Sequence, residues 1–421
     1  MSSTNRIARQ TALMEQALLW TVRGVNKGQA ADRTLQNWFH QRKYLGSRDR
    51  RFIREAVFAC WRRYGWLSQW EDAPISKQAA LAWRLQHGAL PDPLREGGKD
   101  LPDLPGNLHD LAIDEQARIL TDIGLLAVEP ADLLPLWAKE LVGEEAFPNL
   151  CRALTQRPPT WLRAAGGDAK SLTEWLTAQN AEIAASNEPD ARAIREDRIV
   201  HELGQAVPGM AEVQDLASQA VVRFAAPEKG QTWWDLCAGA GGKSLHLADR
   251  VGTKGRILAT DPRREAIEEA RRRLKRSRYQ NVDLRTVAAE EATLPEGVVP
   301  QGLLVDAPCS GSGVWARQPD APWRMSRRQI RKQAETQLAL LQTAADLVPE
   351  GASLVYAVCS VFPLEGAEVV AAFEAAHPEF TRVATPHPLD PTQNDTDGSI
   401  LLQPSPGVHD GMFMTRWIKS S

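Results

Sequence analysis

From residue 216 onward, short apolar segments alternate with helical ones, and this alternation restricts the fold more than any other feature of the chain. The strand candidates are Thr232–Cys237, Arg256–Thr260, Val282–Val287, Gly302–Asp306 and Ser353–Val358, and the helices between them include Arg263–Arg276 and Met325–Leu347. Such alternation predicts an α/β domain with a mostly parallel sheet and helices on both faces. Ligands of such sheets bind where the strands end, among the loops at their carboxyl edge.

The first half of the chain has a different pattern. Residues 7–70 are predicted to be helical, because one apolar face recurs at helical spacing through Phe52, Ile53, Ala56, Val57, Cys60, Trp61 and Tyr64. We expect Ser47 to cap that helix, with Asp49 in its first turn. Residues 73–115 are rich in Pro, Gly and Asp and predict a long loop. A mixed stretch after residue 146 predicts a small α/β subdomain.

Composition excludes several classes of protein. The chain has 421 residues, 43% hydrophobic and 24% charged, which is typical of globular proteins and excludes wholesale disorder. No apolar stretch reaches the ~18 residues of a membrane-spanning helix, and the start has no apolar core of a secretory signal. Five cysteines without a CxxC pattern argue against a disulfide framework or a zinc site. We therefore expect a reducing cytoplasm, no membrane and no metal.

Charge is distributed unevenly along the chain. Residues 1–70 hold 13 Lys and Arg against 4 Asp and Glu, a formal charge of +9. Because the whole chain has a net charge of −3, the remaining residues carry −12. A basic end on a mildly acidic protein favours a polyanionic partner. A solvated helical surface rich in arginine explains the charge equally well, and charge alone leaves both interpretations open.

A glycine-rich loop follows the first predicted strand of the α/β domain, over residues 235–244. Glycines at 239, 241 and 242 allow the backbone to approach a ligand at a helix N-terminus. The phosphate-binding pattern GxxxxGK[ST] fails at Cys237, and the dinucleotide pattern GxGxxG fails at Ser244. An adenosyl cofactor without a diphosphate remains compatible, and Asp261 ends the next strand where a carboxylate can accept ribose hydroxyls. A tight turn with a helix-capping aspartate is the alternative.

Two further strand ends carry a cysteine. Asp306 and Cys309 lie in Leu304-Val-Asp-Ala-Pro-Cys-Ser-Gly-Ser-Gly-Val-Trp315, and Cys359 lies in Leu354-Val-Tyr-Ala-Val-Cys-Ser-Val-Phe-Pro363. A single cysteine at such a place is most often buried and inert. Two at equivalent strand ends beside a cofactor loop favour a thiol nucleophile, whereas Cys237 is better explained as structural or as a backbone contact.

These three segments resemble the RsmB/Sun-type RNA (cytosine-5) methyltransferases, whose cofactor loop is DLCAAPGGKT-like and whose cysteine loops are DAPCSGxG and YATCS. The resemblance extends to Val213–Gln219 and Asp410–Met414. More loosely, Leu45–Arg51 and the helix after it are similar to the NusB-like RNA-binding domain of bacterial members, and Arg157–Arg163 to the link into the catalytic part. The resemblance implies a helical NusB-like domain (1–145), a small α/β linking subdomain (146–215) and a Rossmann-like methyltransferase domain (216–421).

The resemblance also implies roles for residues. Cys359 would attack cytosine C6, Cys309 would assist breakdown of the adduct, and Asp306 would bind the N3/N4 edge of the base. S-adenosylmethionine would be bound by Cys237, Ala238, Gly239, Ala240, Gly241, Gly242, Lys243, Asp261, Glu291 and Asp306. The chain departs from the family at Gly239-Ala240, where Ala-Pro is usual, and at Val358, where Thr is usual. Glu291 stands where the family has Asp, and its neighbour Glu290 is a rival for that role.

The expected activity is S-adenosylmethionine-dependent methylation of cytosine C5 in RNA, with 16S ribosomal RNA as the substrate, by a monomer. Two alternatives stay open. A transfer-RNA cytosine methyltransferase uses the same catalytic motifs, although the NusB-like start disfavours it. A non-catalytic RNA-binding assembly factor would keep the fold, although the presence of both Cys309 and Cys359 disfavours that interpretation.

Overall fold

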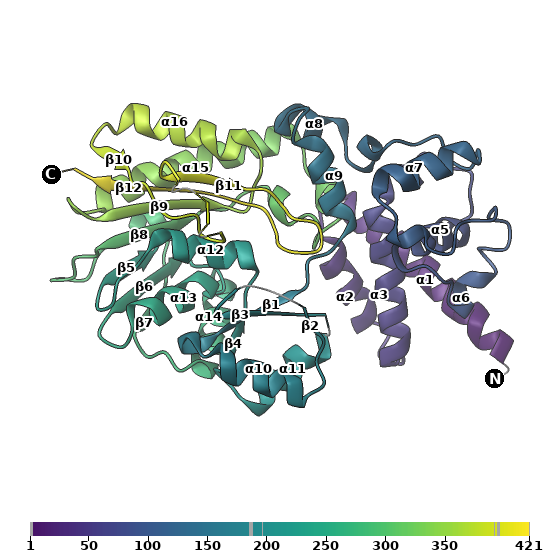
Figure 1. Cartoon of the computed structure of the whole chain (residues 1–421), viewed down its shortest axis with the longest axis horizontal. Helices are drawn as coiled ribbons and strands as arrows, with labels where there is room; N and C mark the ends of the chain where they lie inside the picture. The colour runs from purple at the N-terminus through teal and green to yellow at the C-terminus, as the bar shows by residue number, and fades with distance from the viewer. Residues whose placement is uncertain (1–2, 185–187, 196, 391, 394–395, 421) are drawn as a thin grey trace. The chain divides into compact units, whose positions relative to one another are not determined.

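The computed structural model of the chain describes residues 3–184, 188–195, 197–390, 392–393 and 396–420 (Figure 1). The chain divides into two compact units. The helical unit runs to Arg157 and also takes in Val314–Arg327, and the sheet unit comprises Pro158–Gly313 and the chain from Arg328 onward. The three-domain division with boundaries at residues 145 and 215 stays a proposal.

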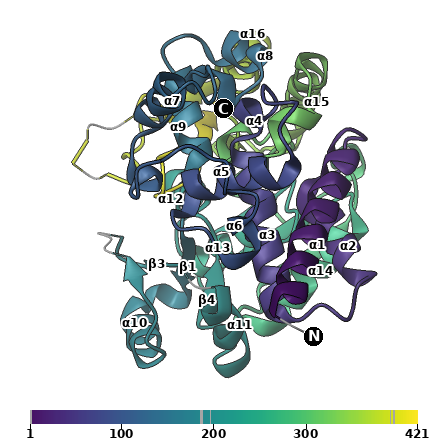
Figure 2. The ribbon, with the colours of Figure 1, turned by 90° about the vertical axis from the view of Figure 1, so that its right-hand side faces the viewer.

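The helical unit is built from α-helices that pack side by side around apolar faces. They are α1 (Ser3–Val25), α2 (Ala31–His40), α3 (Ser47–Arg62), α4 (Tyr64–Leu67), α5 (Ile75–His87), α6 (Asp92–Arg95), α7 (Ile113–Asp122), α8 (Leu136–Val142) and α9 (Phe147–Thr155). Helix α3 contacts both α1 and α5 (Figure 2). The predicted face on α3 is confirmed, since Ile53, Ala56, Val57 and Cys60 are all buried.

Two local predictions in this unit are wrong. Ser47 is the first residue of α3, and the cap position belongs to Gly46, which has no side chain to accept a hydrogen bond. Residues 75–87, expected within a long loop, form α5 instead. The Pro- and Gly-rich composition is concentrated after Gly88, which ends α5 with a φ of +81°, and the alanine-rich stretch before it buries one face.

The segment Val314–Arg327 continues the loop that carries Cys309 and belongs to the helical unit. Its buried Asp320 accepts a hydrogen bond from the backbone N–H of Ala31 at 3.0 Å, at the start of α2, and another from Arg324. Arg62 of α3 donates to the carbonyl of Ala316. These contacts anchor the segment within the unit, because an anion at a helix N-terminus is favourable.

The sheet unit contains a mixed sheet in the order β10-β12-β9-β8-β5-β6-β7, with β11 paired to β12. Its strands are β5 (Thr232–Asp235), β6 (Arg256–Asp261), β7 (Val282–Thr286), β8 (Gly302–Asp306), β9 (Ser353–Val358), β10 (Phe380–Arg382), β11 (Ser399–Leu402) and β12 (Met412–Lys419). The strands from β5 to β9 pair in parallel, as predicted. Strands β10, β11 and β12 pair antiparallel and were not predicted.

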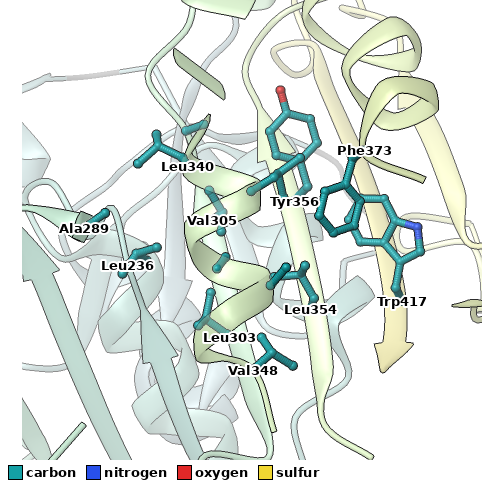
Figure 3. Packing of buried hydrophobic residues seen from close by; sticks show 14 of the residues in the cluster. Leu236, Ala289, Leu303, Val305, Leu340, Val348, Leu354, Tyr356, Phe373 and Trp417 are labelled. Carbon is teal, nitrogen blue, oxygen red and sulfur yellow. The ribbon is translucent and has the colours of Figure 1, made fainter. Parts of the chain in front are cut away.

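Helices cover both faces of this sheet (Figure 1). Helices α12 (Leu216–Ala225) and α13 (Gly242–Val251) pack on one face, and α15 (Arg327–Leu347) and α16 (Ala367–Ala376) on the other. Figure 3 shows the second layer, where Leu340 of α15 and Phe373 of α16 meet side chains of β8, β9 and β12. Helix α14 (Arg264–Arg276) joins β6 to β7. The strand order reverses at β5, which places a binding site at its carboxyl end.

The sheet unit also contains a small antiparallel sheet, which comes before the mixed sheet in the chain and has the strand order β2-β3-β1-β4. Its elements are β1 (Thr160–Ala164), α10 (Ala169–Ala178), β2 (Ile183–Ala184), β3 (Ala191–Ile194), α11 (Asp197–Ala206) and β4 (Ala211–Val213). The buried Arg163 of β1 joins it to α13 through an ion pair of 2.8 Å with Asp249. Across the ranges that the structure describes, no helix combines the length and the apolar character needed to span a membrane.

Candidate active site

A cavity of about 610 Å³ lies at the carboxyl ends of β5, β6, β8 and β9. It gathers most of the residues that the sequence singles out as cofactor-binding or catalytic. Those that line it are Cys237, Ala238, Gly239, Ala240, Gly242, Lys243, Asp261, Asp306, Cys309 and Cys359. The three motifs, which span more than a hundred residues of chain, therefore form one site, as expected for loops at one edge of a parallel sheet.

The glycine-rich loop between β5 and α13 needs its glycines for conformation and for space. Gly239 and Gly241 have φ values of +54° and +79°, in the left-handed region that glycine adopts without strain. A Cβ atom on Gly241 would lie 3.1 Å from that of Ala270 in α14. Gly241 therefore shapes the turn, while Gly239 and Gly242 face the cavity.

The loop is held from outside by an arginine. Arg273 of α14 donates from Nη1 to the carbonyl of Ala240 at 3.2 Å, and from Nη2 to Glu212 at 2.8 Å. Both side chains of this ion pair are largely buried. Ala240 stands where the family usually has a rigid proline, so these contacts restrain a loop that lacks it.

Asp261 ends β6 beside this loop, with its side chain buried. Its carboxylate accepts hydrogen bonds from the backbone N–H of Gly239 at 2.9 Å and from the Arg263 side chain at 2.8 and 2.9 Å. Burial acts to raise the pKa of this carboxyl, but the hydrogen bonds outweigh it, so the pKa lies below its ordinary value. The result is an ionised acceptor at the cavity wall.

The donor set fits an adenosyl cofactor. An ionised carboxylate at a strand end suits a ribose, an open glycine turn admits close backbone contact, and Pro262, Ala289 and Leu340 supply apolar wall for a purine ring. Glu290 lines the cavity with them. Glu291 was expected in that place, but Glu290, its rival, is the one of the two that lines the cavity, although both side chains are exposed.

We predict that Asp261→Ala weakens S-adenosylmethionine binding roughly tenfold or more, because a hydrogen bond to a charged group contributes about 1.5–3 kcal/mol. Isothermal titration calorimetry measures the dissociation constant. Glu268→Ala serves as the matched control, since it removes an exposed carboxylate of α14 that pairs with Arg271 and does not line the cavity, and its affinity should not fall. Wild-type affinity in the Asp261→Ala variant would contradict the assignment.

Asp235 was not among the residues predicted for the site, although it begins the glycine-rich motif. Its side chain is fully buried at the end of β5, where Oδ2 accepts a hydrogen bond of 2.6 Å from the hydroxyl of Ser244. Burial raises the pKa of this carboxyl from 3.8 to about 7, with a further contribution from the nearby Asp306. Asp235 therefore has a structural role, because its hydrogen bond to Ser244 stiffens the glycine-rich loop.

The raised pKa of Asp235 predicts a pH-dependent stability. The folded state binds the proton more tightly than the unfolded state, so the contribution is full below about pH 4 and is lost as the pH rises to about 7. Each pKa unit corresponds to about 1.4 kcal/mol, so the loss amounts to a few kcal/mol at most. Urea denaturation at pH 5 and 8 should show a smaller drop for Asp235→Asn than for the wild type. Equal drops would count against this prediction.

Lys243 and Asp306 form an ion pair inside the cavity. Lys243, in the first turn of α13, donates from Nζ to Oδ2 of Asp306 at 2.7 Å, and both side chains are largely buried. Burial alone would lower the pKa of the lysine, but the charge and hydrogen bond of Asp306 raise it above its ordinary value. The lysine therefore stays positively charged beside Cys359, whose negative form also favours that charge.

The two loop cysteines lie side by side. Cys309 follows β8 and Cys359 follows β9, and their Sγ atoms are 3.3 Å apart. Both are partly exposed, unlike Cys60 and Cys151, which are buried. The hydrogen bond with Cys359, burial and the charge of Glu365 together hold the pKa of the Cys309 thiol well above its ordinary value. Cys309 therefore keeps its proton at neutral pH.

Sequence reasoning missed the residues beneath this pair. Glu365, Gln337 and Tyr356 are fully buried and form hydrogen bonds around both cysteine loops. A buried carboxylate without a cation is uncommon, but its burial could not be read from the pattern Pro363-Leu-Glu365, which is typical of an exposed turn.

Solved structures share the fold of this chain. The structure of the protein PH0851 matches 97% of this chain and 98% of its own, with a TM-score of 0.73 and 22% identity. The structure of NSun6 from Pyrococcus horikoshii, with SFG, matches 68% of this chain and 98% of its own, with a TM-score of 0.55 and 17% identity. These likenesses concern the fold.

The relatives of this chain in sequence are named as methyltransferases of ribosomal RNA. Ribosomal RNA small subunit methyltransferase B of Klebsiella pneumoniae subsp. pneumoniae is 33% identical over 305 residues, and the match spans 68% of this chain but only 66% of the relative. The namesake from Citrobacter koseri is 30% identical over 333 residues, which cover 76% of this chain and 74% of the relative. The family described as 16S rRNA methyltransferase RsmB/F matches residues 222–418. The chain belongs to this family.

Proposed function

We propose that this chain methylates C5 of cytosine in 16S ribosomal RNA, with S-adenosylmethionine as methyl donor, through a covalent bond from Cys359 to C6. The observation that carries the proposal is the pair of thiols 3.3 Å apart, on a cavity shared with Asp261 and Asp306. Neither a nucleotide-binding module nor an assembly factor requires two adjacent thiols beside an ion-paired lysine. The names of the relatives support ribosomal RNA as the substrate.

The chemistry requires a nucleophile because C5 of cytosine is too electron-poor to accept a methyl group unaided. The Cys359 thiolate forms a bond to C6, and the former C5=C6 electron pair then makes the bond from C5 to the methyl group. Loss of the C5 proton restores the double bond and breaks the S–C6 bond, which returns the thiolate. When bound, S-adenosylmethionine supplies the activated methyl group.

We assign attack to Cys359, because this is the role that the resemblance to the family implies for it, and its thiol lines the cavity together with Lys243 and Asp306. The hydrogen bond to Cys359 is the leading cause of the raised pKa of Cys309. Once the Cys359 sulfur is bonded to C6 it is a thioether and a weaker hydrogen-bond acceptor, so the pKa of Cys309 falls. The Cys309 thiol then releases its proton to solvent, and the resulting thiolate takes the C5 proton.

Asp306 and Lys243 complete the proposed base pocket. The Oδ1 atom of Asp306 is not used by Lys243, and the side chain is partly exposed to the cavity. We assign it to the N3/N4 edge of cytosine, where a hydrogen bond favours addition at C6. Lys243 holds Asp306 in place through their ion pair of 2.7 Å.

The activity is tested by incubating the purified protein with 16S rRNA transcribed in vitro, S-adenosylmethionine and, separately, transfer RNA. Bisulfite sequencing then locates any 5-methylcytosine. New 5-methylcytosine in 16S rRNA alone supports the proposal, and modification of transfer RNA alone favours the alternative substrate. An assay that also includes assembling small subunits and detects no methylation on any RNA would contradict the enzymatic interpretation.

The basic first seventy residues are proposed to bind RNA phosphates, and the structure refines which arginines are available. Arg50 donates from Nε to the carbonyl of Leu45 at 2.9 Å and lies over the ring of Phe39, so it stabilises the α2–α3 connection. Arg48 and Arg51, by contrast, are exposed on the first turns of α3. The proposal therefore rests on Arg48 and Arg51 and excludes Arg50.

We predict that the double variant Arg48→Ala/Arg51→Ala binds 16S rRNA more weakly and with a smaller salt dependence. Each lost phosphate contact should reduce the slope of log K against log salt by about 0.7–0.9. Filter binding at several salt concentrations measures this slope, and Arg118→Ala is the control, since that exposed arginine of the same unit lies outside the basic segment. An unchanged slope in the double variant would assign the charge to solvated surface.

We also propose that the protein acts as a monomer in the cytoplasm, where ribosomal subunits assemble. All five cysteines are unpaired thiols, which is the usual state of cysteines in a reducing compartment. Sedimentation of the purified protein tests the monomeric state.

A further inference from the structure

The carboxylate of Glu365 lies beneath the two catalytic loops. Glu365 ends the 3₁₀ turn Pro363–Glu365 that follows β9, and its side chain is fully buried. Among the residues that the structure describes, no lysine or arginine pairs with it. It does not line the cavity, so it contacts neither base nor cofactor site directly. A buried charge of this kind is costly unless hydrogen bonds satisfy it.

Hydrogen bonds from both cysteine loops satisfy this carboxylate. Oε1 accepts from the backbone N–H of Ser310 at 2.8 Å, and Oε2 accepts from the hydroxyls of Ser310 and, at 2.6 Å, of Ser360. Ser310 follows Cys309 directly, and Ser360 follows Cys359. One side chain therefore joins the residues next to both sulfur atoms.

A second layer fixes the carboxylate itself. Gln337 of α15 donates from Nε2 to Oε1 of Glu365 at 3.0 Å and to the carbonyl of Pro308, next to Cys309, at 2.9 Å. The hydroxyl of Tyr356 lies 2.6 Å from the backbone carbonyl of Glu365 and 3.1 Å from Oε1 of Gln337. The ring of Tyr356 belongs to the hydrophobic layer beneath the sheet (Figure 3), so the network is anchored in the core.

Beyond the ends of their strands, the two cysteine loops are joined by hydrogen bonds. Strands β8 and β9 pair in parallel only as far as Asp306 and Ala357, before either cysteine is reached. Beyond this register, the backbone contacts Ala307 N–H to the carbonyl of Ala357 and Gly313 N–H to that of Cys359 link the loops. The hydroxyl of Ser312 also lies 2.9 Å from that of Ser360. The Glu365 carboxylate is the charged centre of this connection.

We propose that Glu365 is a positioning residue, which holds the Cys309 and Cys359 loops against each other so that both thiols act on one base. The inference deepens the proposed function and rests on it for its catalytic consequence. The geometric part is independent, because it concerns only the distance between two sulfur atoms. A displacement of about 1 Å in such a pair is enough to lower a reaction rate about a hundredfold.

The geometric part is tested without RNA. Dibromobimane bridges two neighbouring thiols and becomes fluorescent only when both have reacted. We expect rapid bridging in the wild type, none in Cys309→Ala, and a markedly slower reaction in Glu365→Ala. Glu365→Gln keeps the size of the side chain, its amide oxygen can accept from Ser310 N–H and Gln337, and its NH₂ group can donate to the two serine hydroxyls, so it should restore bridging. Glu374→Gln is the matched control, because Glu374 pairs with Arg382 and Trp417 away from the site.

The catalytic part is tested by steady-state kinetics on the same variants. Glu365→Ala should lower kcat about a hundredfold, while KM and the calorimetric affinity for S-adenosylmethionine stay close to wild type, and Glu365→Gln should recover most of kcat. Where Glu365→Ala does not fold, Ser360→Ala removes the side-chain hydrogen bond between Glu365 and the Cys359 loop and should show the same effects more weakly.

The outcomes separate this inference from the proposed function. Wild-type bridging and wild-type kcat in Glu365→Ala would overturn the positioning role. Slower bridging in that variant, combined with a wild type that methylates no RNA, would support the geometric role and contradict the proposed activity. A loss of S-adenosylmethionine affinity equal to the loss of kcat would also overturn the inference, because it would indicate general disruption of the site.

Discussion

Cys359→Ala is expected to abolish methylation of 16S rRNA and to form no covalent RNA complex. Cys359 lines the cavity together with Lys243 and Asp306, and the resemblance to the family implies that it is the attacking thiol. Without attack on C6, C5 does not become nucleophilic, so the loss should be on the order of 10³-fold or more, as for other covalent nucleophiles. Transfer of a labelled methyl group to RNA measures the rate.

Two controls show whether the loss is chemical. The affinity of Cys359→Ala for S-adenosylmethionine should stay close to wild type, since the cofactor carboxylate Asp261 is unchanged. Cys237→Ala lies on the same cavity and should retain most of the activity, because that thiol is assigned no chemical role. Methylation by Cys359→Ala at a rate near wild type would contradict the proposed nucleophile.

The strands of the catalytic sheet could be predicted because they are buried on both faces. Leu303, Leu304 and Val305 of β8 are all fully buried, and such strands appear in a sequence as short continuous apolar runs. Strand β12 was missed although Met412, Phe413 and Met414 are buried too, because the polar pair Thr415 and Arg416 interrupts its apolar run. Its partner β9 also lies more than fifty residues earlier. No local signal predicts that pairing.

The residues of the site likewise include some that could be predicted from the sequence and some that could not. Asp261, Asp306, Cys309 and Cys359 could be predicted, because each ends a recognisable strand and carries a reactive group where ligands bind. Glu365 could not, because its importance depends on burial beneath residues 5 and 55 positions away in the chain. A side chain that acts through tertiary packing leaves no pattern in its own neighbourhood.

Fine placement of similar residues also required the structure. Glu290 and Glu291 are indistinguishable in sequence, and only the turn at Ala289–Glu291 shows which of them faces the cavity. Arg48 and Arg50 likewise carry the same charge two residues apart. The structure engages Arg50 with the carbonyl of Leu45 and leaves Arg48 exposed.

Cys309→Ala is expected to give the opposite result to Cys359→Ala, an accumulation of covalent protein–RNA complex. Attack by Cys359 and transfer of the methyl group do not need Cys309, but removal of the C5 proton does. The adduct should therefore form and persist, and turnover should fall to a small fraction of the wild-type rate. A denaturing gel with labelled 16S rRNA measures the complex as a band of reduced mobility.

The comparison between the two variants decides which thiol attacks. The positions of the two sulfur atoms do not distinguish the attacking thiol, because the atoms are only 3.3 Å apart and either could reach the same base. Cys359 is assigned the attack because its loop is the one that the resemblance to the family implies for the nucleophile. A retarded band with Cys359→Ala in place of Cys309→Ala would reverse the assignment, as in enzymes whose nucleophile follows the proline of the first loop. The double variant should form no adduct under either assignment, so a band there would indicate a third nucleophile.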